Sequence, residues 1–107
     1  MKFSIEFTTG ARQDLLKIQH YIKSSGKPAT AAQLVADITE VCKTLREDPE
    51  RGHVPEELQS LSNFLCRQII FKNYRITYQV IGKIVLIYGV IDGRRSLREV
   101  MRQRQLL

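Results

Sequence analysis

The run 74-YRITYQVIGKIVLIYGVIDGRR-95 decides the fold of this chain. Its first half alternates, and the apolar residues that fall on one face of a strand are Tyr74, Ile76, Tyr78 and Val80. A period of two is typical of a half-buried strand. The second half, residues 84–91, is almost wholly apolar, which is typical of a central strand covered on both faces. Gly82 and Lys83 between the two halves predict a hairpin turn.

Two amphipathic helices are predicted ahead of this hairpin. In the first, which ends at Gly26, the apolar residues recur at helical spacing: Ala11, Leu15, Ile18 and Ile22. The second runs from Pro28 or Thr30 to Asp48, with a broad apolar stripe of Ala31, Leu34, Val35, Ile38, Val41, Cys42 and Leu45. Because the link between them is short, the helices are expected to lie antiparallel as a helical hairpin. Asp14 and Lys17 stand one turn apart and are interpreted as a surface pair.

Shorter segments complete the predicted fold. Phe3–Phe7 alternates as a short strand, and Phe64–Phe71 is a strand that turns into the central hairpin. Residues 49–63 form a loop in which His53 is interpreted as a solvated side chain. An S-x-x-E capping box opens a short helix over Ser96–Leu107.

These elements predict a single α+β domain over residues 1–107. Its order is β-α-α-β-β-β plus a short C-terminal helix, with the helical hairpin packed on one face of an antiparallel sheet. The other face of the sheet is expected to remain open, and Arg75 is expected to point to it.

The positive charge of the chain is concentrated in its C-terminal part. Residues 1–65 carry eight Lys or Arg against nine Asp or Glu, and residues 66–107 carry nine against two, so the net charge of +6 divides into −1 and +7. This asymmetry favours an anionic partner. The start of the chain is too short and too polar for a signal peptide, and no apolar run reaches the length of a membrane span. A cytoplasmic protein without a membrane partner is expected.

Few residues are available for catalysis. No phosphate-binding loop, metal-ligand spacing or nucleophile constellation is present, so no metal and no cofactor are expected. What remains is a basic cluster whose members are proposed to bind the target: Arg67, Lys72, Arg75, Arg94, Arg95 and Arg98. Arginine forks suit phosphate and carboxylate equally well, so an RNA backbone and an acidic protein surface both stay open.

The chain resembles the RelE/ParE superfamily of bacterial type II toxin–antitoxin toxins over nearly its whole length. The resemblance lies in the order of elements and in four segments: ARQDLLKIQHYI, DPERGHVPEEL, YRITYQV and VIDGRR. It implies a growth-inhibiting toxin with the α+β fold predicted above. It also implies a cognate antitoxin, whose acidic C-terminal segment would fold on the toxin. Three apolar positions are considered for that groove: Leu16, Val35 and Cys42.

The superfamily holds two activities, and both are kept as alternatives. RelE-like members cut mRNA on the ribosome, which requires phosphate-binding arginines and a proton-transfer group. On that pattern the arginines fall on Arg75 and Arg95, the only catalytic candidates if the chain is a ribonuclease. The pattern's tyrosine falls on Met101 and its lysine pair falls near Gln68 and Ile70. The proton-transfer groups are therefore missing.

ParE-like members are not enzymes but poison DNA gyrase, and the P-x-x-G-H-V-P-E-x-L loop and the D-G-R-R turn favour this branch. Asp92 and Ser96 depart from the pattern, because this branch commonly has His and Asp at those positions. A third hypothesis is a basic nucleic-acid-binding module without toxicity. The lack of exposed aromatic residues interleaved with the basic ones argues against it. Deletion of residues 98–107 is expected to weaken toxicity more than folding.

Overall fold

The computed structural model describes residues 2–59 and 66–106. Its elements in chain order are β1 (Ser4–Phe7), α1 (Thr9–Ser24), α2 (Pro28–Lys43), two short 3-10 turns η1 (Thr44–Arg46) and η2 (Glu56–Leu58), β2 (Arg67–Phe71), β3 (Tyr74–Ile81), β4 (Ile84–Asp92) and α3 (Leu97–Gln103). Residues 64 and 65 of the strand expected at Phe64–Phe71 lie outside the described residues. None of the described helices is long and apolar enough to cross a membrane.

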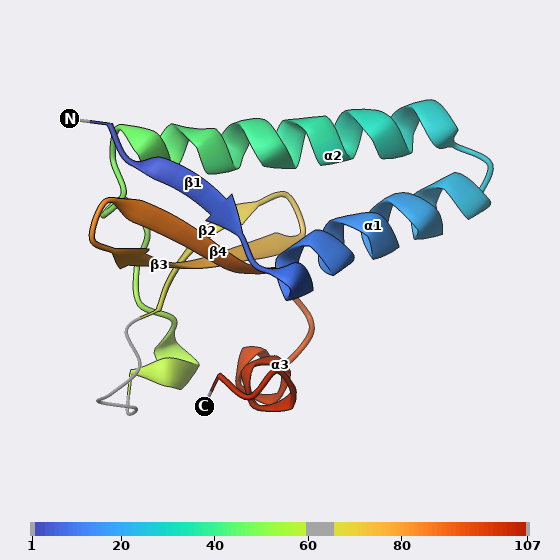
Figure 1. Cartoon of the computed structure of the whole chain (residues 1–107). Coiled ribbons are helices and arrows are strands. Elements are labelled where there is room, and N and C mark those ends of the chain that lie inside the picture. The colour runs from blue at the N-terminus through green and yellow to red at the C-terminus, as the bar shows by residue number, and fades with distance from the viewer. Residues whose placement is uncertain (1, 60–65, 107) are drawn as a thin grey trace.

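The strands form one mixed sheet in the order β1-β4-β3-β2 (Figure 1). β2, β3 and β4 make the expected antiparallel meander, and β4 is central. β1 instead pairs parallel with β4. The two helices and the β2–β3 hairpin lie between these strands in the chain, and parallel strands require such a long connection. Gly82 opens the β3–β4 turn with a φ of 59°, a left-handed conformation that glycine adopts without strain.

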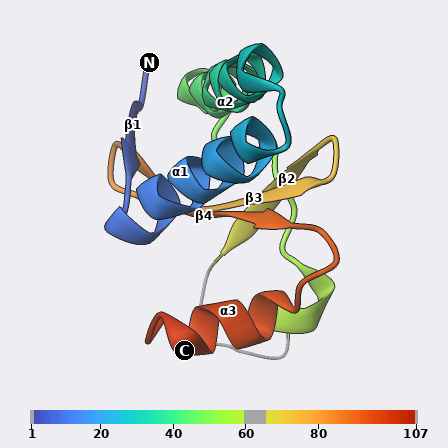
Figure 2. The same cartoon turned by 90° about the vertical axis from the view of Figure 1, so that its right-hand side faces the viewer.

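The helical hairpin of α1 and α2 covers one face of the sheet (Figures 1 and 2). The core between them contains Ala11, Ile38, Cys42, Leu45, Ile69, Ile76, Tyr78, Val85, Ile87 and Val90. The alternation predicted for β3 is therefore confirmed, with Ile76 and Tyr78 turned toward the helices. Cys42 is fully buried in this core, which excludes it from an exposed partner groove and raises the pKa of its thiol to about 12.

The other face of the sheet is partly covered as well, whereas it was expected to remain open. Figure 2 shows α3 on the side of the sheet opposite the helical hairpin. A second apolar cluster fills this layer with Leu58, Cys66, Ile91, Leu97, Val100 and Met101. The predicted cap is in place, since the Ser96 hydroxyl accepts a hydrogen bond from the Glu99 amide at 3.2 Å. The short C-terminal helix is thus a packed layer and not a free basic tail.

The helix α2 ends earlier than predicted. It stops at Lys43 and tightens into the 3-10 turn η1, whereas the apolar stripe and Pro49 indicated an end at Asp48. The Arg46 carbonyl accepts the Phe3 amide at 3.1 Å, which joins this turn to the start of β1. The last carbonyl of η1 therefore has a partner outside the turn.

A buried ion pair ties the two layers together. The Asp14 carboxylate of α1 accepts hydrogen bonds from Arg104 Nη1 at 2.9 Å and Nη2 at 2.5 Å, and from the Val90 amide at 3.0 Å. The side chains of Asp14 and Arg104 are 7% and 23% exposed. The interpretation of Asp14 as a surface partner of Lys17 was wrong. β1 ends opposite Ile87, and the Asp14 carboxylate takes the place of a strand partner beyond it.

Gly89 provides the room for this ion pair. It lies at an irregularity in the β3–β4 ladder, where the register shifts between Thr77 and Tyr78. A Cβ atom on Gly89 would stand 3.1 Å from Arg104 Nη1 and 2.9 Å from Ile91 Cδ1. A side chain at this position would crowd the guanidinium, which donates to the Tyr88 carbonyl at 3.1 Å.

We expect Arg104→Ala to lower the free energy of unfolding by about 3 kcal/mol, because it leaves the Asp14 carboxylate buried and unpaired. Arg104→Lys should be intermediate, since lysine keeps the charge but not the fork. The matched control is Arg102→Ala, which removes a guanidinium that is 70% exposed and should cost less than about 1 kcal/mol. Urea denaturation measures all three, and equal costs for the two alanine variants would contradict the role given to the pair.

Candidate functional site

Arg75 reaches the face of the sheet opposite the helical hairpin, as predicted, but it is not free there. Its Nη1 and Nη2 donate to the two Glu57 carboxylate oxygens at 2.8 Å and 2.6 Å, and its Nε donates to Gln68 Oε1 at 2.7 Å. The Arg75 side chain is only 12% exposed. The hydrogen bonds from Arg75 lower the pKa of the Glu57 carboxyl, which stays ionised. Glu57 therefore occupies the position that an anionic ligand of Arg75 would need.

His53 continues this network from the loop. It forms an antiparallel bridge with Gln68, in which the His53 amide donates at 3.1 Å and the Gln68 amide donates back at 2.7 Å. The side chains also meet, with His53 Nε2 3.0 Å from Gln68 Nε2. His53 is exposed on the loop, as interpreted, and its backbone also pairs with the outer edge of β2.

Arg67 supports the same loop. Its Nη1 donates to the Gly52 carbonyl at 2.8 Å and to the Glu50 carbonyl at 3.3 Å. The buried Tyr78 hydroxyl fixes the neighbouring backbone by donating to the Pro49 carbonyl at 2.7 Å and accepting the Gly52 amide at 2.9 Å. Arg67 is thus bound within the fold, and its guanidinium is engaged before any partner arrives.

The remaining members of the basic cluster are exposed around the exit of β4. Arg94 is 92% exposed and its guanidinium lies 3.0 Å from Asp92. Hydrogen bonds from the Arg94 side chain and backbone lower the pKa of the Asp92 carboxyl to about 2. Arg95 and Arg98 are exposed on the turn after β4 and at the start of α3. Lys72 sits in the β2–β3 turn with its Nζ 5.5 Å from the centroid of the Phe71 ring.

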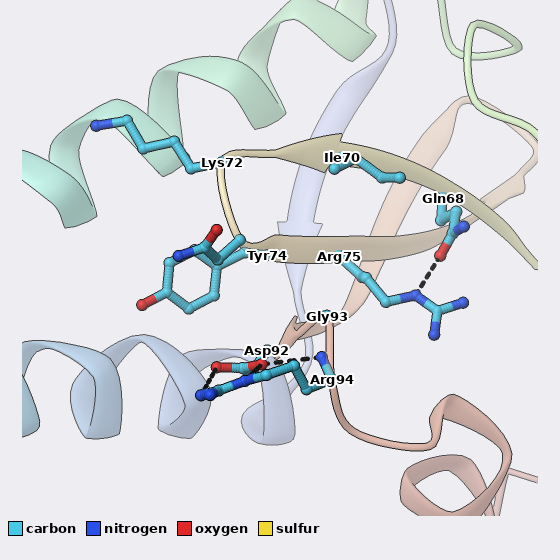
Figure 3. A pocket seen from close by; sticks show the side chains of 9 residues that line it. Gln68, Ile70, Lys72, Tyr74, Arg75, Asp92, Gly93 and Arg94 are labelled. Atoms are coloured by element: carbon cyan, nitrogen blue, oxygen red, sulfur yellow. Dashed lines mark hydrogen bonds and ion pairs between the residues drawn. The ribbon is translucent and has the colours of Figure 1, made fainter.

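A groove of about 570 Å³ brings several of these residues together (Figure 3). It is lined by Gln68, Ile70, Lys72, Asn73, Tyr74, Arg75, Asp92, Gly93 and Arg94. In Figure 3 Arg75 is joined to Gln68, while Asp92 and Arg94 lie together below Tyr74. The groove therefore unites Lys72, Arg75 and Arg94, whereas Arg67, Arg95 and Arg98 lie outside its lining.

The positions that the ribonuclease pattern assigns to proton transfer cannot perform it. Met101 is fully buried in the second apolar cluster. Gln68 is 6% exposed and held by Arg75, and Ile70 is a 63% exposed apolar side chain on β2. The groove can attract an anion through its cations, but at these positions it offers neither an acid nor a base.

The chain thus forms a small α+β domain with a helical hairpin on a mixed sheet and a groove lined by basic residues. A family model described as the ParE toxin of the type II toxin–antitoxin system parDE matches residues 5–97. The chain belongs to this ParE toxin family, within the RelE/ParE superfamily. A search of curated protein sequences gave no match.

Three solved structures share the fold. A chromosomal ParDE toxin–antitoxin system from P. aeruginosa is 23% identical over 85% of this chain and 96% of that chain, with a TM-score of 0.72. The RelBE2 toxin–antitoxin complex from Mycobacterium tuberculosis is 22% identical over 86% and 99%, with a TM-score of 0.61. A mutant of the E. coli toxin RelE in the free state is 19% identical over the full length of both chains, with a TM-score of 0.58.

Two residues that hold the arginines were not found from the sequence. Glu57 lies in a loop without periodicity, and Asp14 has its partner 90 residues away. The relevant pattern in the sequence is the excess of Lys and Arg over Asp and Glu in residues 66–107, which indicates that some of these cations pair with carboxylates from the N-terminal part.

We expect Glu57→Gln to lower the free energy of unfolding at neutral pH by about 1 kcal/mol, because Arg75 loses its charged partner. The pKa of Glu57 is lowered from 4.5 in the folded protein, so its contribution is present above pH 4.5 and is lost as the pH falls through the lowered value. The difference between wild type and variant should therefore shrink on acidification. Urea denaturation across this range measures it, with the exposed neighbour Glu56→Gln as control. A pH-independent difference would contradict the ion-pair explanation.

Proposed function

We propose that this ParE family member is the toxin of a type II toxin–antitoxin system, that it inhibits growth by poisoning DNA gyrase in the cytoplasm, and that a cognate antitoxin neutralises it. Membership of the ParE family supports this branch directly. The similar solved structures include a ParDE system and a RelBE2 toxin–antitoxin complex, which supports an antitoxin as partner. The chain acts as one toxin domain without a cofactor.

One observation carries the preference for gyrase over mRNA. On the face of the sheet opposite the helical hairpin, Arg75 is held by Glu57 and Met101 is packed into the core. A missing acid or base costs a nuclease about a hundredfold or more in rate. The alternative of a RelE-like ribosome-dependent ribonuclease keeps two supports: Arg75 and Arg95 occupy its arginine positions, and the fold matches that of E. coli RelE.

The target surface is proposed at the exit of β4. Arg94, Arg95 and Arg98 are exposed there and Lys72 stands across the groove, whereas Arg67 and Arg75 are engaged within the fold. Rigid elements on both sides, β4 and α3, hold this turn in place. Charges on an exposed rim govern the rate and selectivity of encounter more than the stability of the fold.

The function is tested by induced expression in a bacterial host, in which DNA damage and translation are measured separately. Gyrase poisoning gives filamentation, an SOS response and cleaved DNA complexes while translation continues. Immediate translational arrest with in-frame mRNA cuts would overturn the gyrase proposal in favour of the ribonuclease. Co-expression of the protein encoded beside this gene should restore growth if that protein is the antitoxin. No growth defect at full expression would contradict both toxin proposals.

We expect Arg95→Ala to reduce toxicity by about tenfold while changing the free energy of unfolding by less than about 0.5 kcal/mol, because the side chain is exposed. The matched control is Arg46→Ala, which removes an exposed arginine near the start of β4. Growth of serially diluted cultures after induction measures both. Equal toxicity of the two variants would contradict the surface assigned to the target.

Deletion of residues 98–107 is not a clean test of that surface. It removes Val100 and Met101 from the second apolar cluster and Arg104 from Asp14. Loss of buried residues of this kind typically costs several kcal/mol in stability, so a loss of toxicity on this deletion would not separate the target surface from the fold.

A further inference from the structure

An aromatic ring stands exposed beside the cations at the exit of β4. Tyr21 of α1 is 74% exposed. It borders a hollow of about 470 Å³ between α1 and the end of β4. The hollow is lined by Asp14, Lys17, Ile18, Tyr21, Tyr74, Val90, Asp92, Arg94 and Arg95. The fold thus brings together aromatic and basic side chains that lie far apart in the sequence.

Helical spacing explains why α1 presents this set. Asp14, Lys17, Ile18 and Tyr21 follow one another at steps of three, one and three, which places them on one face. Asp14 at the base of the hollow is neutralised by Arg104, and Asp92 is paired with Arg94. The rim is therefore positive, because Lys17 and Arg95 are exposed beside the ring of Tyr21.

The hollow continues into the groove on the other side of Tyr74. The two cavities share Tyr74, Asp92 and Arg94, and Lys72 lies at the far end of the groove. Figure 3 shows Tyr74 above Asp92 and Arg94, with the side chain of Lys72 beyond it. A ligand several units long could therefore follow a line of cations from Lys17 to Lys72.

We propose that this surface binds single-stranded DNA, with a base stacked on Tyr21 and the phosphates held by Lys17, Arg94 and Arg95. A positive track with an exposed ring suits an unpaired strand, since every base has a face that can stack. The choice of DNA over RNA rests on the proposed function, because the gyrase target works on DNA. Binding to the strand itself is independent of that function.

The geometry favours a nucleic-acid strand over an acidic peptide. A peptide often gains affinity by adding a strand to a free sheet edge. Here β4 lies between β1 and β3, and beyond the end of β1 its Val90 amide is already bound by Asp14. The ring of Tyr21 stands out from the surface, whereas a peptide anchor needs a pocket to enter. Phosphates and bases need only the cations and the ring.

The test is fluorescence anisotropy with a labelled oligo(dT) of about twelve nucleotides, titrated with the purified chain from about 50 to about 200 mM salt. The wild type should bind this strand more tightly than a duplex of the same length. Tyr21→Ala should weaken binding about tenfold, and Tyr21→Phe should keep it within about twofold, because stacking needs the ring and not the hydroxyl. Lys17→Ala should lower the slope of log K against log salt by about 0.7, the loss of one phosphate contact.

The matched control is Lys23→Ala, which removes an exposed charge from the opposite side of α1 to Tyr21. Equal weakening by Lys17→Ala and Lys23→Ala, or equal affinity for single strand and duplex, would reduce the binding to general charge and overturn the proposal. Tighter binding of oligo(rU), or Tyr21-dependent binding of an oligoglutamate peptide in place of oligo(dT), overturns the assignment to DNA. Circular dichroism confirms that each variant is folded. Binding of oligo(dT) without gyrase poisoning would contradict the proposed function alone.

Discussion

The Asp14–Arg104 ion pair is the interaction on which the arrangement of layers depends. It joins α1 on one side of the sheet to the end of α3 on the other, and its carboxylate also binds the Val90 amide of the central strand. Such a pair need not add much net stability, because removing two charges from water offsets most of their attraction. Its main effect is on the specificity of the fold, because only one placement of the C-terminal segment gives both charges a partner.

The placement of α3 decides what the sheet can do. With Arg104 fixed, Leu97, Val100 and Met101 close over Ile91, and η2 comes in beside them with Leu58. Glu57 of that turn then reaches Arg75 and occupies its fork. Part of this face of the sheet is thereby converted into core. Function is left to the rim, where the turn after β4 meets α1 and the β2–β3 turn.

Much of the fold can be predicted from the sequence because it depends on patterns that extend over only a few residues. The alternation of β3, the apolar run of β4, the Gly82 turn and the Ser96 cap each depend on residues within a few positions of one another. The covered second face could not be predicted in this way. From the sequence alone, Arg104 cannot be distinguished from a surface cation, because its partner Asp14 lies 90 residues away. In the same way, no local pattern around Glu57 indicates that it pairs with Arg75. Ion pairs between residues far apart in the chain leave no periodic pattern in the sequence.

The same reasoning changes the meaning of the charge asymmetry. Of the nine cations in residues 66–107, Arg75 and Arg104 are matched by carboxylates from the N-terminal part, and Arg94 and Arg102 by Asp92 and Glu99. A net charge of +7 for a stretch of sequence is therefore not the charge of a surface. Part of the exposed excess lies at the exit of β4, where it includes Arg95 and Arg98. Because this small excess lies beside the exposed ring of Tyr21, selectivity for a ligand should come from the combination of ring and cations and not from charge alone.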